Sequence, residues 1–237
     1  MTSSALRRKI NTFRVDPIGS TKDKVQTLLP RITNQWGKKR LAESGALDIL
    51  LEFLSARPPS GFSPDFADLW FLYQKVRRRR PRIIFEFGSG CSTVILAKAL
   101  FDNKNSSHGI NGYLYSIDAD PYWEQSTRAS IPASLKDCCE VVYSPVLETE
   151  YDGILSFRHS RIPDVSPDFV YLDGPPLTAE RQVAIDILDM EDRFSPGFFL
   201  VVDGRKENTK FLKQYLKRRY RFRDRKLFFN SVFTLVS

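Results

Sequence analysis

Short apolar runs and helical apolar stripes alternate along the second two-thirds of the chain. Five runs have the length and composition of strands, and they cover residues 83–87, 113–118, 140–143, 169–173 and 198–203. Apolar residues recur at helical spacing between several of these runs, as at Val94, Ala97 and Phe101. Because strands that alternate with helices form a parallel sheet covered on both faces, the pattern predicts an α/β fold.

Later segments complete the expected sheet, and one long connection interrupts it. Residues 226–229 and 231–236 flank Asn230 and predict an antiparallel hairpin that closes the sheet. Residues 183–194 carry a helical apolar stripe, whereas residues 144–167 show no clear periodicity. We therefore expect a helix over the former and a long functional connection over the latter.

The first 80 residues carry three amphipathic stripes and predict a helical extension. The stripes lie within residues 25–32, 47–54 and 66–73, and Asp65 is placed to cap the third helix. The second stripe consists of Leu47, Leu50, Leu51 and Leu54. We expect an N-terminal helical cap over residues 1–80, which would cover an acceptor site, and a catalytic domain over residues 81–237.

Positive charge is concentrated in two segments. The formal net charge is +8, and the excess lies mainly in residues 77–82 and 217–223. Either segment could attract phosphates, nucleic acid or an anionic membrane surface, and the alternative is a solvated basic face. Tyr220 and Phe222 alternate with arginines, which is also typical of a strand with one buried face.

Other features limit the class of protein. No apolar stretch approaches the ~20 residues that span a bilayer, and no apolar segment follows the basic N-terminal residues, so we expect no membrane span and no secretory signal. Cys91, Cys138 and Cys139 form no disulfide framework, which favours reduced thiols in a cytoplasmic protein. His108 and His159 have no neighbour at metal-ligand spacing, so a zinc site is not expected.

A glycine turn marks the end of the first expected strand. Residues 83–93 read Ile-Ile-Phe-Glu-Phe-Gly-Ser-Gly-Cys-Ser-Thr, which predicts a strand, a tight turn and a helix start. Glycines let a ligand approach the backbone, and the first N–H groups of the helix are free to donate. The charge of Glu86 argues against a pyrophosphate there. The alternative is a plain turn between strand and helix.

The segment from Glu86 to Ser92 resembles the first motif of class I S-adenosylmethionine (SAM)-dependent methyltransferases. The layout after residue 82, including the C-terminal hairpin, is similar to their whole core. The resemblance implies a three-layer Rossmann-like sheet, mostly parallel with an antiparallel C-terminal hairpin. It also implies SAM as cofactor, with Gly88, Ser89 and Gly90 beneath its methionine part and Ser92 at the donor-rich helix start.

Two acids receive cofactor roles from the same resemblance. Glu86 would hold the amino group of SAM, and Asp118 would accept hydrogen bonds from the ribose hydroxyls. The alternative for Asp118 is a helix cap before Pro121. Acids also end the later strands, at Asp173 and Asp203, and all four are expected at one rim of the sheet. Such a rim needs a compensating ligand, such as a donor-rich molecule, a sulfonium or a metal ion.

The catalytic residues are less clearly indicated. Asp173-Gly-Pro-Pro partly matches the Asn/Asp-Pro-Pro-aromatic motif of amino-methyltransferases, but Gly174 intervenes and Leu177 replaces the aromatic residue. Asp173 and Asp203 also resemble carboxylates of metal-dependent O-methyltransferases, so Mg²⁺ is a second candidate cofactor, although Gly204 stands where that family has Asn. An ion-paired turn made by Asp203 and Arg205 is the alternative.

Asp173 is the candidate that would orient or deprotonate the acceptor, and His159 is the second. The alternative for His159 is a surface-loop histidine.

These observations favour a SAM-dependent methyltransferase that acts on a small-molecule or saccharide-like acceptor. The second hypothesis is a nucleic-acid-associated protein, RNA-binding or RNA-modifying, that uses its basic segments on a methyltransferase-like scaffold. A third, an NAD-type dehydrogenase, is disfavoured by Thr93, where the dinucleotide fingerprint has Gly or Ala, and by the terminal hairpin. The sequence identifies neither the acceptor nor the oligomeric state.

Overall fold

The computed structural model describes residues 31–107, 109–176, 183–225 and 230–237. Within these residues the main sheet has seven strands in the order β3-β2-β1-β6-β7-β9-β8. The first five pair in parallel, whereas β9 pairs antiparallel with β7 and β8. The strands are β1 (Ile83–Phe87), β2 (Tyr113–Asp118), β3 (Cys139–Tyr143), β6 (Phe169–Leu172), β7 (Phe199–Asp203), β8 (Tyr220–Arg225) and β9 (Asn230–Leu235). The predicted fold class is confirmed.

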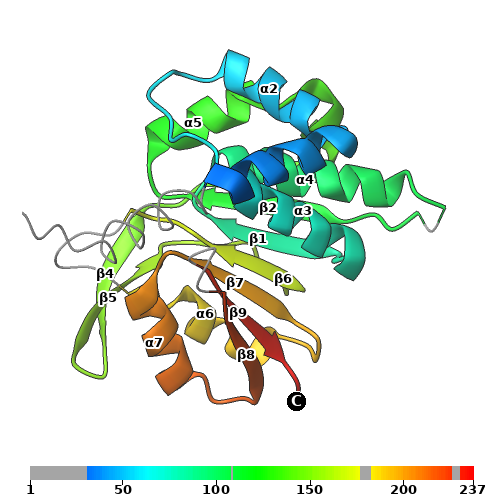
Figure 1. Cartoon of the computed structure of the whole chain (residues 1–237). Coiled ribbons are helices and arrows are strands. Elements are labelled where there is room, and N and C mark those ends of the chain that lie inside the picture. Colours follow the sequence, from blue (N-terminus) through cyan, green and yellow to red (C-terminus); the bar gives the residue numbers. More distant parts are fainter. Residues whose placement is uncertain (1–30, 108, 177–182, 226–229) are drawn as a thin grey trace, which may run out of the picture.

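Helices cover both faces of this sheet (Figure 1). One face carries α2 (Ala46–Ala56), α3 (Phe66–Arg79), α4 (Cys91–Lys104) and α5 (Pro121–Ser130), and the other carries α6 (Asp186–Asp189) and α7 (Lys206–Tyr215). Residues 31–43 are helical, and short 3₁₀ segments span Ala133–Cys138 and Glu191–Arg193. The result is a three-layer sandwich. No helix in the described ranges is long and apolar enough to cross a membrane.

Strand residues alternate between two hydrophobic cores. Phe169 and Tyr171 pack with α2, α3 and α4, whereas Val170 and Leu172 pack with α6 and α7. This alternation follows from the period of two in a β-strand. The same alternation places the side chain of Glu86 on the α4 side of the sheet, because Glu86 shares a strand face with Ile84.

The N-terminal helices share the core of α4 instead of forming one of their own. Leu47 and Leu50 of α2 and Leu69 and Trp70 of α3 are buried in it. Asp65 caps α3 as predicted, by accepting hydrogen bonds from the backbone N–H groups of the next helical turn. Leu51 was expected on the buried face but is 47% exposed. The first predicted stripe falls outside the described residues except at its end, where Ile32 is exposed.

Residues 144–167, expected as one long connection without clear periodicity, contain secondary structure. The segment contains an antiparallel hairpin of β4 (Val146–Tyr151) and β5 (Ile154–His159). Its two-residue turn is Asp152-Gly153, and both residues have positive φ, 51° and 75°. Asp-Gly is a strong sequence signal for such a turn, so this hairpin was readable from the sequence.

The helix expected over residues 183–194 is a single turn, α6, followed by a 3₁₀ segment. The chain before it is held as an extended bridge, because Phe157 of β5 exchanges backbone hydrogen bonds with Val183 and Ile185. The side-chain amide of Asn208 bonds both the N–H and the carbonyl of Ala184. These residues therefore cannot join the helix.

The C-terminal hairpin exists, but its first strand is β8. Residues 226–229, predicted as that strand, lie outside the described residues. Phe222 of β8 contacts Phe233 of β9 at a ring-centroid distance of 5.0 Å, and Tyr220 packs beside it. The alternation of aromatics with arginines thus marks a strand with one buried face, as the second interpretation of this segment predicted.

Candidate active site

A cavity of about 590 Å³ lies at the carboxyl ends of β1, β2, β6 and β7. This edge includes the point where the strand order reverses, between β1 and β6, which is where ligands bind in open α/β sheets. Its size suits a ligand pocket, which commonly measures about 300–1,000 Å³. One side is lined by the glycine turn and α5. The other side is lined by the ends of β6 and β7, by Phe53 and Arg57, and by residues 61–65 and 68–69.

The turn after β1 approaches the turn after β6 too closely for side chains. A Cβ placed on Gly174 would lie 2.4 Å from the Cα of Gly88, and a Cβ on Gly88 would lie 2.8 Å from the N of Gly174. Gly88 also has a φ of 94°. A Cβ on Gly90, in contrast, would meet no atom within 4 Å. The turn is therefore packed on one side and open toward the cavity on the other, which leaves room for a ligand over its backbone.

Asp118 at the end of β2 is bonded to this turn. Its Oδ2 accepts hydrogen bonds from the backbone N–H of Ser89 at 2.9 Å and from the Ser89 hydroxyl at 2.5 Å. The helix before Pro121 is capped by Asp120 and not by Asp118. The capping alternative for Asp118 is thus wrong. Ser89, Ser92 and Asp118 all line the cavity.

Glu86 lies inside β1, not at its end, and does not line the cavity. It is fully buried, and it accepts hydrogen bonds from Thr93 of α4 at 2.5 Å and from Ser116 of β2 at 2.6 Å. Desolvation raises the pKa of Glu86 to about 7, although Ser116, Ser92 and Thr93 donate to its carboxylate and oppose the shift. Glu86 is behind the turn because it shares a strand face with Ile84, which packs in the core beside α4.

Four carboxylates line the opposite side of the cavity: Asp65 before α3, Asp68 of α3, Asp173 after β6 and Asp203 at the end of β7. The pKa of Asp68 is raised to about 8, mainly by desolvation and secondly by repulsion from Asp203. The pKa of Asp203 is raised to about 7, mainly by desolvation and secondly by repulsion from Asp173. Asp173 is accessible from the cavity but lies deep among protein atoms, so desolvation raises its pKa as well. The hydroxyl of Tyr171 donates to Asp173 at 3.4 Å.

Arg205 lies beside this acidic wall and is attracted by Asp173 and Asp203. One of its nitrogens donates to the backbone carbonyls of Asp173 and Pro175. Its Nε and Nη1 have no hydrogen-bond partner among the described residues, although the side chain is buried. No direct ion pair joins Arg205 to Asp203 among the described residues. Arg205 nevertheless opposes the rise in the pKa of both Asp173 and Asp203, so it partly neutralises these acids, as the alternative interpretation expected.

The described residues give no support to the Mg²⁺ site expected at Asp173 and Asp203. No group of three His, Cys, Asp or Glu side chains among the described residues could hold a metal ion. Asn208, the nearest asparagine after Asp203 in the sequence, is fully buried and occupied by the backbone of Ala184.

His159 is in neither of its two expected places. It belongs to β5 and is 5% exposed, so it is not a surface-loop histidine, and it is absent from the cavity lining. Its Nδ1 lies 3.2 Å from Asp186 Oδ2, and its ring packs on Phe87 with centroids 5.0 Å apart. The structure gives His159 a buried structural position.

Several cavity residues were not identified from the sequence. Asp68 comes from the N-terminal helical region, and Trp123 comes from α5. Arg57 and Phe62 belong to the loop between α2 and α3. The sequence indicated only that the N-terminal helices would cover an acceptor site, because no motif spans this region.

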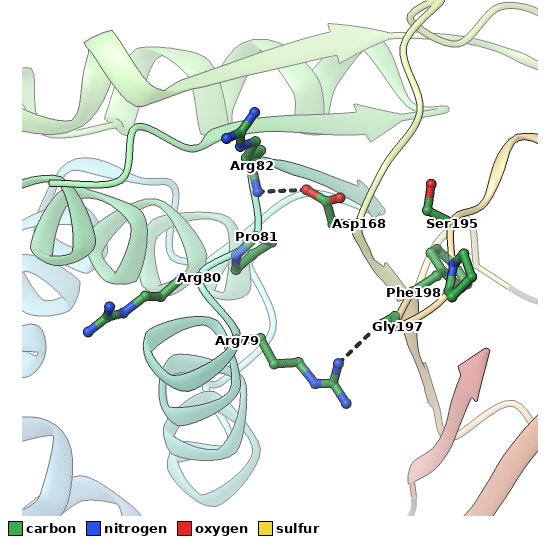
Figure 2. Close-up of a pocket in the computed structure, with 9 residues that line it drawn as sticks. Arg79, Arg80, Pro81, Arg82, Asp168, Ser195, Gly197 and Phe198 are labelled. Atoms are coloured by element: carbon green, nitrogen blue, oxygen red, sulfur yellow. Dashed lines mark hydrogen bonds between the residues drawn. The ribbon is translucent and has the colours of Figure 1, made fainter. Parts of the chain in front are cut away.

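A second hollow, of about 300 Å³, lies at the opposite edge of the parallel strands (Figure 2). It is bordered by Arg79, Arg80 and Arg82 and by Asp168, which accepts a hydrogen bond from the backbone N–H of Arg82. Figure 2 shows that the three arginine side chains point in different directions. They do not converge on one anion.

Comparison with known proteins identifies the class to which this fold and cavity belong. Residues 85–204, about half of the chain, match the model of a family described as a methyltransferase domain. The chain belongs to this family and is a class I SAM-dependent methyltransferase. The NAD-dehydrogenase hypothesis is therefore excluded.

Solved structures show the same fold at low sequence identity. An O-methyltransferase from Bacillus cereus in complex with SAH is 18% identical, with a TM-score of 0.50, over 80% of this chain and 91% of that one. The SAH-bound methyltransferase PaMTH1 from Podospora anserina is 12% identical, with a TM-score of 0.51, over 92% of this chain and 96% of that one. A search of curated protein sequences finds no significant match.

Proposed function

We propose that this methyltransferase acts on a small-molecule or saccharide-like acceptor, bound in the same cavity as SAM. The carrying observation is that a single cavity is lined by the glycine turn on one side and by Asp68, Asp173 and Asp203 on the other. A cofactor bound over the turn and an acceptor bound beside the acidic residues would therefore lie in the same cavity, with no protein atoms between them. Proximity of this kind provides much of the rate in a transfer reaction.

The residues around the turn fit SAM. Its sulfonium and amino group are positive, and the cavity lining is rich in carboxylates. We assign backbone contacts to Gly88, Ser89, Gly90 and Ser92, and the ribose hydroxyls to Asp118. Bound SAM supplies an already activated methyl group. We assign Glu86 an indirect role, in which it holds Thr93 and thereby the start of α4 beneath the cofactor.

Asp173 is our candidate for orienting and deprotonating the acceptor hydroxyl. Its carboxylate is accessible from the cavity, and the Tyr171 hydroxyl 3.4 Å away restricts its orientation. A general base works best when its pKa is close to the working pH, and desolvation shifts Asp173 in that direction. Asp203 and Asp68 lie beside it and would accept hydrogen bonds from further hydroxyls, which suits a polyhydroxylated acceptor.

Residues 1–80 are proposed to form the cap over the acceptor. The support is that Asp65 and Asp68, together with the loop residues Arg57 and Phe62, line the cavity opposite the glycine turn. A cap of this kind excludes water from the transfer.

The test separates cofactor binding from transfer. SAM binding is measured by isothermal titration, and transfer by incubating the protein with methyl-tritiated SAM and a cell extract that is then separated by size. We expect label in the fraction of small molecules. Asp173→Asn should bind SAM within about threefold of wild type but lose transfer by about 10²-fold or more, the scale of general-base catalysis. Asp164→Asn, at an exposed carboxylate that pairs with Arg193, is the matched control.

Two outcomes would contradict this proposal. Label confined to macromolecules would exclude a small-molecule acceptor. Full activity of Asp173→Asn would exclude Asp173 as the base.

A further inference from the structure

The basic last turns of α3 and the basic edge strand β8, which are far apart in the sequence, meet on one side of the sheet. The last turns of α3 carry Lys75, Arg78 and Arg79, and the edge strand β8 carries Arg223 and Arg225. We call these five side chains the basic face. None of them lines the active-site cavity.

Aromatic rings hold the basic face together. Arg79 lies over Phe199 at 3.8 Å, and Lys75 lies between Phe199 at 5.9 Å and Phe71 at 5.2 Å. Arg225 covers the other part of Phe71 at 3.6 Å. Cations and rings therefore form one continuous row from α3 to β8, and Arg225 of β8 directly contacts Phe71 of α3.

The charges of this face are only partly compensated. Asp68 attracts Arg225, and Arg79 donates a hydrogen bond to the backbone carbonyl of Gly197. In the described part of the chain, Lys75, Arg78, Arg79 and Arg223 form no ion pair with a carboxylate. Desolvation and the repulsion of Arg78, Arg79, Arg225 and Arg223 lower the pKa of Lys75. Holding like charges together is unfavourable, and a bound polyanion would relieve the repulsion.

Protection of an edge strand explains only part of the arrangement. Charged side chains on β8 prevent pairing with other sheets. That role does not require the cations of α3, which belong to a helix and are placed against β8 through Phe71 and Phe199. Because cations from a helix and from an edge strand are placed side by side, we interpret the basic face as a binding surface.

We propose that the basic face binds the phosphate backbone of nucleic acid, independently of the proposed small-molecule reaction. The rings of Phe71 and Phe199 are buried and covered by cations, so they are not available to stack on bases. Binding would thus be through phosphates and independent of sequence.

An anionic membrane fits the observations less well. Peripheral membrane surfaces combine cations with exposed apolar side chains. The large apolar side chains that are exposed in the described residues lie outside α3 and β8. Arg80 and Arg82 are not part of the face, because Figure 2 shows their side chains pointing away from Arg79.

Fluorescence anisotropy with a labelled 20-base-pair RNA or DNA duplex of arbitrary sequence tests the proposal. With about four phosphate contacts, the affinity should fall by about 10²-fold between 50 and 200 mM KCl. Arg78→Glu/Arg223→Glu, at two exposed positions, should weaken binding at least tenfold and flatten the salt dependence. Lys136→Glu/Lys206→Glu is the control, because it changes the net charge equally at exposed positions outside the face.

Thermal unfolding and SAM titration verify that both variants are folded. Absence of binding at 50 mM KCl, or equal losses in the two double variants, would overturn the proposal. Binding to vesicles of phosphatidylserine and phosphatidylcholine that is lost in Arg78→Glu/Arg223→Glu, without binding to either duplex, would also overturn it and assign the face to membranes. The failure of small-molecule methylation would leave it unaffected.

Discussion

The carboxylate of Asp118 accepts hydrogen bonds from both the backbone N–H and the hydroxyl of Ser89. These bonds join the end of β2 to the glycine turn after β1. The residue assigned to the ribose of SAM therefore also orders the turn beneath its methionine part. Substitutions at this position should affect both.

Asp118→Asn is expected to weaken SAM binding by roughly 10- to 100-fold. The substitution removes the charge from hydrogen bonds that contribute about 1.5–3 kcal/mol each when one partner is ionised. Isothermal titration with SAM measures the effect. Asp137→Asn, at an exposed position of the 3₁₀ segment before β3, should bind like wild type. Unchanged affinity in Asp118→Asn would remove Asp118 from the cofactor site.

Glu86→Gln is expected to change how stability depends on pH. The pKa of Glu86 is about 7 in the folded protein and near 4.5 when unperturbed, so the folded state holds the proton more tightly. The free energy of unfolding should therefore decrease as pH rises from about 4.5 to about 7, by up to about 3 kcal/mol. Glu86→Gln lacks this decrease.

Urea unfolding at pH 5, 6, 7 and 8 compares the two proteins. The advantage of Glu86→Gln over wild type should grow across this range. Glu140→Gln, at an exposed position of β3, should follow the wild-type curve. A constant difference between wild type and Glu86→Gln would show that Glu86 has an ordinary pKa.

Gly174→Ala is expected to displace the glycine turn. The new Cβ would lie 2.4 Å from the Cα of Gly88, so one of the two turns must move. We expect a loss of about 1–3 kcal/mol in stability and weaker SAM binding. Gly153→Ala, in the β4–β5 turn where a Cβ meets no atom within 4 Å, should lower stability through its positive φ but leave SAM affinity unchanged. Equal SAM affinities in both variants would argue against a turn that supports the cofactor.

Asp203→Asn is expected to shift the titration of Asp68 below its pKa of about 8. Repulsion from Asp203 is the second cause of that raised pKa, after desolvation, so the shift should be partial. NMR of ¹³C-labelled aspartate carboxyls measures it directly. The remote variant Asp164→Asn should leave Asp68 unchanged. An unchanged titration in Asp203→Asn would show that the two carboxylates do not interact.

Local patterns predicted the elements whose boundaries are set by nearby residues. Asp65 caps α3, and the turn from Gly88 to Gly90 follows a buried strand, as expected. Asp152-Gly153 carries an equally local signal for the turn between β4 and β5. The short α6 could not be predicted, because its preceding residues are held by Phe157 and Asn208, which are remote in the sequence.

The residues of the candidate site also fall into two groups, those that local sequence patterns predicted and those that only tertiary contacts brought together. The sequence alone determined the α/β class, the glycine turn and the position of Asp118 beside that turn. The last holds because the carboxyl ends of parallel strands gather at one edge of the sheet, whatever the details of packing. Only the tertiary structure decided that Glu86 lies behind the turn, that His159 is buried against Asp186, and that Asp68 joins Asp173 and Asp203. It also brought α3 and β8 together. These relationships depend on which face of the sheet each strand residue occupies and on contacts between segments that are distant in the sequence. Local patterns do not specify how distant segments pack against one another.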